Sequence, residues 1–228
     1  PTLEQVETLS DKGNLIPIYR EINADLETPV SAYLKVAKPP YSFLLESVEG
    51  GDRIARYSFI GTEPRKVIKT GKNQPDGAID PLIPISDELS KFKMIQLEDQ
   101  QRFNGGAVGY LAYEAVNYFE QLPSPDSDIL NLPESIFMVT TTFLIFDHLR
   151  HRIRIVSHAH LNGNVKQAYT EAINRIDNLV NRLTKPVKMP QNNQIASVNK
   201  SPEIKSNITK KKYAEMVRQC KQYIVAGS

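Results

Sequence analysis

The longest β-type pattern in the chain lies between residues 136 and 160. Its first part, IFMVTTTFLIFD, is almost entirely β-branched, aromatic or aliphatic, which is typical of a strand buried on both faces. In its second part Ile153 and Ile155 alternate with arginines, so one face should be exposed to water. The pattern predicts a long hairpin that turns around Asp147 and His148.

Helical periodicity appears elsewhere. Between Val165 and Leu183 apolar residues recur every three or four positions, which predicts an amphipathic helix. Three further helix starts are predicted. Thr2 and Gln5 can form a capping box, and Thr28 can cap a helix whose first residue is Pro29. Ser86 or Asp87 can cap a third helix. The long hairpin and the amphipathic helix between Val165 and Leu183 both agree with an α+β class.

The end of the chain reads differently. Residues 186–207 are polar, interrupted by proline and without a period, which predicts a linker after a first region over 1–185. Beyond the linker, residues 208–228 form one helix capped by Thr209, with an apolar stripe through Tyr213, Val217, Cys220 and Ile224. A single amphipathic helix has no core of its own, so we expect the chain to be the N-terminal part of a longer protein.

A short hairpin at residues 41–61 combines apolar and polar positions: YSFLLESVEGGDRIARYSFIG. A two-residue turn at Gly50 and Gly51 would set Leu45 opposite Arg56. One face would then carry Phe43, Leu45, Ser47, Ile54, Arg56 and Ser58, with Glu46 on the other face unless a longer loop shifts the register. An apolar floor with a guanidinium and two hydroxyls suits a flat ring that bears a carboxylate and an amine. The alternative is a hairpin with one wet face, in which Arg56 simply pairs with Glu46 or Asp52.

Charge and cysteine content narrow the classes of protein. The net charge is +2 and basic residues are scattered, which argues against a nucleic-acid surface, even one built on Arg150, Arg152 and Arg154. No apolar run is long enough to span a membrane and no signal segment opens the chain, so a cytoplasmic location is expected. Cys220 is the only cysteine, which leaves no intrachain disulfide or Cys-based metal cage.

Other motifs favour structural roles. The four histidines cluster between positions 148 and 160 at spacings unsuited to a metal, and we expect them on an exposed polar strand. Gly105, Gly106 and Gly109 match no phosphate-binding fingerprint, so close backbone packing is the better interpretation. No pairing of nucleophile and base is apparent, and no catalytic residue is predicted in this chain.

Four segments resemble a known family in the same order along the chain: NLIPIYREINADLETPVSAYLKV, YSFLLESVEGGDRIARYSFIG, GGAVGYLAYEAV and SNITKKKYAEMVRQCKQYIVAG. They look like the N-terminal half of anthranilate synthase component I. The resemblance implies an antiparallel β-sandwich with outer helices, a regulatory region over residues 1–185 and the first helix of a chorismate-binding domain over 208–228. The family's catalytic residues and its Mg²⁺ site would lie in the half that follows.

The resemblance also assigns the short hairpin. In this family the Leu-Leu-Glu-Ser segment belongs to the allosteric site for L-tryptophan, the inhibitory end product. Carried over by position, Ser47 is the expected ligand contact, with Leu45, Glu46, Arg56, Tyr57 and Ser58 as neighbours. The implied partners are chorismate, L-tryptophan and a glutamine amidotransferase subunit that supplies ammonia. Two alternatives remain, a para-aminobenzoate synthase component of the same fold and a standalone amino-acid-binding regulatory module.

Overall fold

The computed structural model describes residues 1–46, 56–97, 103–123, 128, 130–187 and 205–227. The chain divides into two compact units, Pro1–Lys188 and Met189–Ser228. Each unit is considered by itself below. Within the described residues, no helix combines the length and the apolar character needed to cross a bilayer.

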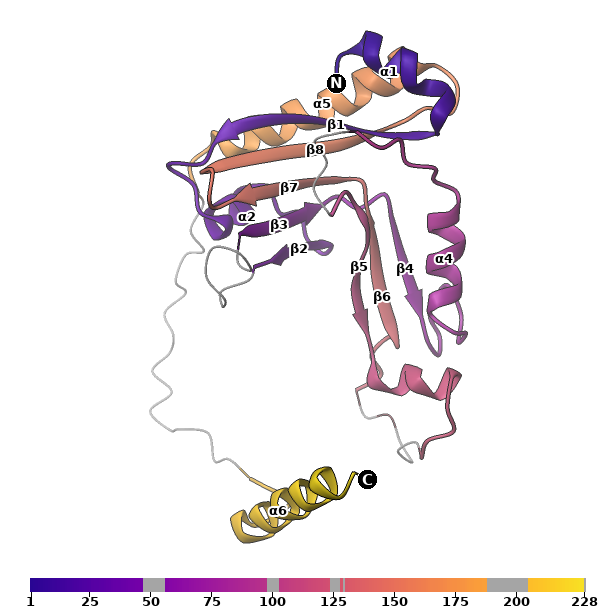
Figure 1. Ribbon diagram of the computed structural model, residues 1–228, viewed down its shortest axis with the longest axis vertical. Coiled ribbons are helices and arrows are strands. Elements are labelled where there is room, and N and C mark those ends of the chain that lie inside the picture. The colour runs from indigo at the N-terminus through magenta and orange to yellow at the C-terminus, as the bar shows by residue number, and fades with distance from the viewer. Residues whose placement is uncertain (47–55, 98–102, 124–127, 129, 188–204, 228) are drawn as a thin grey trace. The chain divides into compact units, whose positions relative to one another are not determined.

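The first unit combines two antiparallel sheets with outer helices (Figure 1). Its elements are α1 (Leu3–Leu9), β1 (Leu15–Asn23), α2 (Pro29–Val36), β2 (Ser42–Leu45), β3 (Tyr57–Thr62), β4 (Lys66–Thr70), α4 (Leu82–Ser90), β5 (Gly106–Leu111), β6 (Ser135–Thr140), β7 (Thr142–Asp147), β8 (Arg152–His160) and α5 (Val165–Leu183). The larger sheet has the order β1-β8-β7-β3-β2, and the smaller has the order β4-β6-β5. The predicted α+β class is confirmed.

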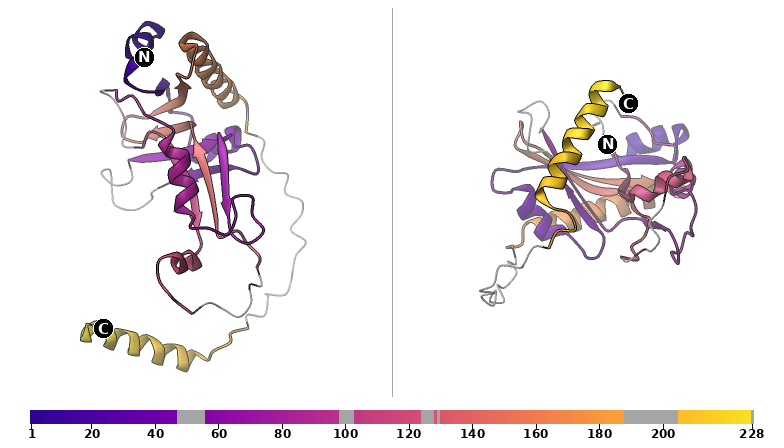
Figure 2. Two further views of the ribbon diagram at one scale, coloured as in Figure 1. Left: turned by 90° about the vertical axis from the view of Figure 1, so that its right-hand side faces the viewer. Right: turned by 90° about the horizontal axis from the view of Figure 1, so that it is seen from below.

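Helices α1, α2 and α5 cover one face of the larger sheet. The side chains that meet there form the main core: Val6, Ile16, Ile18, Ala32, Val36, Ile60, Leu144, Phe146, Ile153, Ile155, Ala159, Ala168, Ala172, Ile176, Leu179 and Leu183. Figure 1 shows α5 running alongside β1 and β8. Figure 2 shows α4 beside the smaller sheet, where Ile85 packs with Ile68 and Val139.

Several predicted helix boundaries are confirmed. The capping box at Thr2 and Gln5 is present, with the Gln5 backbone N–H donating to Thr2 Oγ1 at 3.4 Å. Thr28 caps α2, which begins at Pro29 and ends at Val36, before the two prolines. By contrast, α4 begins at Leu82 and not after Ser86 or Asp87, so that prediction is wrong. The Asp80 carboxylate accepts the Leu82 N–H at 2.9 Å, which favours the earlier start.

The long hairpin is confirmed at its turn but not along its first arm. Strands β7 and β8 pair around the predicted Asp147 and His148. The apolar run before them is two strands, β6 and β7, which belong to different sheets and are separated at Thr141. Since both strands are largely buried, hydrophobic pattern alone does not show where the chain passes from one sheet to the other.

The predicted exposed histidine strand is also wrong in part. His148 and His151 are exposed, but His158 is fully buried on β8 and His160 is half-buried. Beyond Ile155 the strand is covered on both faces, by α5 on one side and by Phe143 on the other. The alternation that predicts a wet face therefore holds only for residues 152–155.

The second unit contains α6 (Lys210–Ala226). Thr209 caps it, as predicted, by accepting the Lys212 N–H at 3.2 Å, and Gly227 ends it with a φ of 76°. Every member of the predicted apolar stripe is exposed or nearly so, and the helix has no buried residue.

Candidate ligand-binding site

The hairpin of β2 and β3 carries most of the residues that the sequence singled out. In the structure Leu45 pairs with Phe59 and Phe43 pairs with Gly61. The predicted register is wrong by three residues, because β2 ends at Leu45 and β3 begins only at Tyr57. An odd shift exchanges the two faces of a strand, so Leu45 and Ser58 lie on opposite faces.

A close approach explains this register. The ring of Phe43 lies against Gly61, and a Cβ on Gly61 would stand only 2.1 Å from Phe43 Cε1. No side chain larger than hydrogen fits there while the ring stays in place. The pairing of Phe43 with Gly61 therefore favours this register of β2 and β3.

The predicted ligand contact, Ser47, lies outside the described residues, and its role stays a prediction. Glu46 directly precedes it and is exposed. Leu45 is 47% exposed at the end of β2. Leu45 and Glu46 are thus accessible to a small molecule.

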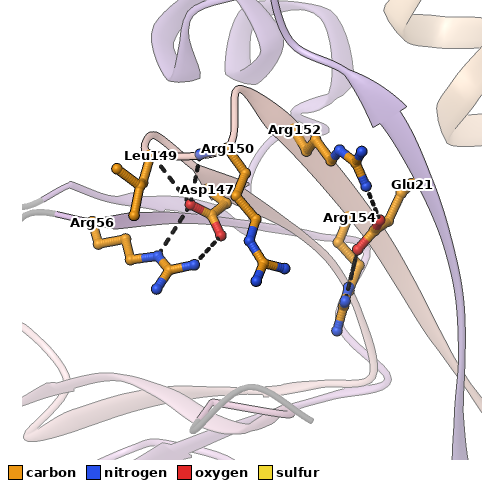
Figure 3. Close-up of polar contacts among 7 residues, drawn as sticks. All are labelled: Glu21, Arg56, Asp147, Leu149, Arg150, Arg152 and Arg154. Atoms are coloured by element: carbon orange, nitrogen blue, oxygen red, sulfur yellow. Dashed lines mark hydrogen bonds and ion pairs between the residues drawn. The ribbon is translucent and has the colours of Figure 1, made fainter. Parts of the chain in front are cut away.

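Arg56 pairs with a residue that the sequence did not suggest. Its Nε donates to Asp147 Oδ1 at 3.1 Å and its Nη2 donates to Asp147 Oδ2 at 2.7 Å, a two-pronged pair (Figure 3). The guanidinium also stands 4.9 Å from the centre of the Tyr57 ring. The alternative pairings with Glu46 or Asp52 are therefore not needed to neutralise Arg56.

The surroundings of Asp147 keep its carboxylate charged. Partial burial by itself would raise the pKa of Asp147, but the hydrogen bonds from Arg56 and from backbone N–H groups bring that pKa below its ordinary value. The backbone donors are Leu149 and Arg150, each 3.1 Å from Oδ1. In turn, the hydrogen bond to Asp147 raises the pKa of Arg56.

Ser58 lies on the helix-covered face of the larger sheet. It is fully buried, and its Oγ is 2.8 Å from His148 Nε2. Register places it opposite Phe146 and next to Ile60, both members of the main core. In this arrangement Ser58 links β3 to the tip of the β7–β8 hairpin and is not accessible to a ligand.

The other face of the larger sheet carries an aromatic cluster. Phe143, Ile145 and Val156 are buried there, and four partly buried aromatic residues pack against them: Tyr19, Tyr57, Phe59 and Phe103. The ring centres of Phe59 and Phe103 are 5.1 Å apart, in an edge-to-face arrangement. Leu45 shares this face through its pairing with Phe59. An apolar surface is therefore present on this face, but it is formed by residues other than those predicted, apart from Leu45.

Charged residues border the aromatic cluster at one end. Glu21 accepts hydrogen bonds from Arg154 and Arg152, which hold the pKa of Glu21 below its ordinary value (Figure 3). The Arg154 guanidinium stands 4.4 Å from the centre of the Tyr19 ring. A cavity of about 20 Å³ is lined by Glu21, Tyr57, Ile145, Asp147, Arg150, Arg152 and Arg154. That volume holds about a single water molecule, so these residues do not enclose a pocket for a larger ligand.

Metal ligands do not gather in the described part of the chain. No group of three or more His, Cys, Asp or Glu side chains within it is arranged to hold an ion. The residues present therefore do not fit the hard oxygen cage that Mg²⁺ requires.

Sequence reasoning missed Asp147 and the aromatic partners Phe59 and Phe103. Arg56 and Asp147 are 91 positions apart, and only the pairing of β3 with β7 brings them together. The signal that was available is the position of Asp147 at a predicted hairpin tip, where an aspartate commonly accepts backbone N–H groups.

Comparisons with known proteins agree with this fold. A family model described as chorismate binding enzyme matches residues 40–228. Anthranilate synthase component 1 of Acetivibrio thermocellus is 37% identical over an alignment that takes in 100% of this chain and 49% of that protein. The protein of the same name from Saccharomyces cerevisiae is 34% identical, over 99% of this chain and 46% of its own length.

One solved structure shows the same fold. The crystal structure of anthranilate synthase component I from Streptococcus pneumoniae TIGR4 superposes with a TM-score of 0.50 at 22% identity, covering 90% of this chain and 45% of that one. The chain thus spans about half the length of the curated relatives that it matches. Since the family model covers most of its residues, the chain belongs to the chorismate-binding enzymes, among which it aligns with anthranilate synthase component 1.

Proposed function

We propose that this chain is the N-terminal regulatory part of anthranilate synthase component I. The observation that carries the proposal is the alignment of 94–100% of the chain with eight proteins of that name or probable assignment, at 32–37% identity and over about half their length. The full-length subunit would convert chorismate and ammonia to anthranilate and pyruvate, a lyase reaction of L-tryptophan biosynthesis. A separate glutamine amidotransferase subunit would deliver the ammonia.

The remaining half of the full-length subunit would hold the chemistry. Mg²⁺, bound there, would neutralise the carboxylates of chorismate, as a hard cation suits oxygen ligands. This chain would contribute regulation. We therefore expect the isolated chain to form no anthranilate from chorismate, ammonia and Mg²⁺.

The proposed regulatory ligand is L-tryptophan, bound on the face of the larger sheet that carries the aromatic cluster. The aromatic cluster around Phe59 offers a floor for the indole ring, with Leu45 beside it. Arg56 offers a guanidinium for the carboxylate, and its side chain is 28% exposed. Ser47 and Glu46 would contact the amino-acid head group.

Inhibition would follow from unequal affinity for two arrangements of the full-length subunit. If tryptophan binds the inactive arrangement more tightly, it shifts the population by that difference, typically about 1–3 kcal/mol. Such a coupling requires no catalytic residue in the regulatory half.

The test uses the full-length subunit with chorismate, ammonia and Mg²⁺, and follows anthranilate by its fluorescence while tryptophan is titrated. We expect turnover that tryptophan inhibits. Ser47→Arg should raise the half-inhibiting concentration of tryptophan by about tenfold or more, because a long cation in place of the proposed ligand contact would remove on the order of 1.4 kcal/mol or more of binding free energy. Ser90→Arg, which adds the same side chain at an exposed position on α4, should leave the inhibition curve unchanged.

Three results would contradict the proposal. An aminobenzoate product with the amino group para to the carboxylate would assign the full-length protein to para-aminobenzoate synthesis. An inhibition curve shared by Ser47→Arg and the unmodified protein would remove Ser47 from the site. Tight stoichiometric tryptophan binding by this chain in calorimetry, without turnover by any longer form, would make it a standalone regulatory module.

A further inference from the structure

The tip of the β7–β8 hairpin holds the segment in which Arg56 lies. Three contacts join them: the two-pronged pair of Arg56 with Asp147, the His148 N–H donated to the Arg56 carbonyl at 2.9 Å, and the Ser58 hydroxyl at 2.8 Å from His148. Figure 3 shows Asp147 between Arg56 and the backbone of the turn. Backbone and side chain of Arg56 are thus both fixed by residues that lie about 90 positions further along the chain.

The tip itself rests on a rigid base. Phe146 and Ile153 are buried on either side of the turn and belong to the main core. Asp147 Oδ1 accepts hydrogen bonds from the N–H groups of Leu149 and Arg150. These bonds orient the carboxylate independently of Arg56. A carboxylate held in this way fixes the plane of a guanidinium, at a lower entropy cost than two mobile side chains would pay.

The pair differs from an ordinary surface ion pair. The Asp147 side chain is only 13% exposed, and two parallel hydrogen bonds define the geometry. The pair uses one N–H at Nε and one at Nη2 of the five that a guanidinium carries. No partner of the other three lies in the described part of the chain.

We propose that Asp147 is a positioning residue of the tryptophan site, which holds the Arg56 guanidinium in place for the carboxylate of the ligand. This inference rests on the proposed regulatory function. Asp147 does not touch the ligand and acts through Arg56.

Asp147→Asn tests the inference in the full-length subunit, because it separates the two tasks of the side chain. The amide keeps an oxygen at Oδ1 for the turn N–H groups, but it places an NH₂ group against Arg56 Nη2 and removes the charge. The half-inhibiting concentration of tryptophan, measured against each variant's own uninhibited rate, should rise about tenfold or more. Asp177→Asn, which breaks the ion pair of Asp177 with Arg20 elsewhere in the unit, should change it less than twofold.

A double variant shows whether Asp147 acts through Arg56. Arg56→Met alone should weaken inhibition, and adding Asp147→Asn should weaken it no further. A purely structural role for Asp147 would instead give additive losses, which would overturn the inference. If Asp147→Asn does not fold, Asp147→Ser carries the same expectation, since a serine hydroxyl also accepts turn N–H groups.

The outcomes separate this inference from the proposed function. An unmodified subunit that tryptophan does not inhibit would overturn the regulatory function and the inference together. An inhibited subunit whose Asp147→Asn variant stays within about threefold would overturn the inference alone. Loss of inhibition in Asp147→Asn, with none in Asp177→Asn and none added to Arg56→Met, supports it.

Discussion

At the scale of single residues, burial decides the chemistry of the histidines. His158 is 1% exposed and its ring lies edge-to-face with Phe143, with centres 5.9 Å apart. Burial lowers its pKa to about 4, with smaller contributions from the positive charges of His160 and Arg175. His158 is therefore neutral at pH 7 and must be protonated, at a cost, when the medium becomes acidic.

The sign of the resulting pH dependence follows from the two pKa values. In the unfolded chain histidine has its ordinary value near 6.5, so below that pH the unfolded state binds a proton that the folded state refuses until about pH 4. The contribution of neutral His158 to the free energy of unfolding is fully present above pH 6.5. It falls as the pH drops from 6.5 towards 4, by about 3 kcal/mol in all.

His158→Leu should flatten this part of the profile. Urea denaturation between pH 7 and pH 4.5 measures it, because the change in the free energy of unfolding with pH is compared within each variant. His151→Gln, at an exposed histidine, should keep the full decline. Equal slopes for His158→Leu and the unmodified chain would show that His158 is not the buried titrating group.

How far sequence predicts a site depends on whether its contacts are local. The sequence shows that segment 41–61 combines apolar and cationic residues, but the exposure of Leu45 and Glu46 is known only from the structure. The burial of Ser58 and the pairing of Arg56 with Asp147 arise from β3 lying beside β7. No local pattern encodes that neighbour, so the sequence alone does not predict that Arg56 pairs with Asp147.

At the scale of elements, the glycines of β5 show how closely two strands approach. A Cβ on Gly109 would lie 1.9 Å from the Ile136 carbonyl oxygen and 2.7 Å from Phe137 Cα. Both atoms belong to the backbone of β6, so neither can rotate away. The interpretation of Gly105, Gly106 and Gly109 as packing residues is confirmed at Gly109, and at Gly105 a Cβ would lie 2.8 Å from the Thr140 carbonyl oxygen. It is wrong at Gly106, where a Cβ would meet no atom within 4 Å; the φ of 128° at this position favours glycine instead.

Gly109→Ala should therefore destabilise the smaller sheet by about 2 kcal/mol, the usual cost of overpacking where the backbone has to shift. The free energy of unfolding from urea denaturation measures the loss. Val108→Ala, at the next position, only removes partly buried methyl groups and should cost about 1 kcal/mol or less. A smaller loss for Gly109→Ala than for Val108→Ala would contradict the close approach.

Elements with local signals are those that the sequence predicts well. Thr2 and Thr28 fix helix starts through capping boxes of two hydrogen bonds each, and Thr209 does so through one. The split of the apolar run into β6 and β7 has no such signal, since both strands are β-rich and largely buried. Its cause is the change of sheet at Thr141, a property of the tertiary fold.

At the scale of the whole molecule, the first unit has a core of its own, whereas α6, considered by itself, is a single helix without a buried residue. The first unit buries a continuous cluster between the larger sheet and three helices. In α6 the apolar residues Tyr213, Val217 and Ile224 are exposed, and the helix has only 17 residues. In proteins most of the stability of a helix comes from tertiary packing of its amphipathic face, so we expect the apolar face of α6 to have a packing partner.

We expect further chain, of the kind that makes the relatives about twice as long, to cover this face in the full-length protein. Cys220 is exposed on α6 and is the only cysteine of the chain. The rate of its reaction with a maleimide therefore measures whether α6 is covered. In this chain alone Cys220 should react freely whether or not α6 is folded. In the full-length protein its labelling, followed by mass spectrometry of the peptide that contains it, should be at least about tenfold slower, because reaction then needs local opening. Denaturant should make the two labelling rates equal. Equal rates in native buffer would contradict the expectation, because they would mean that the apolar face of α6 is exposed in the full-length protein as well.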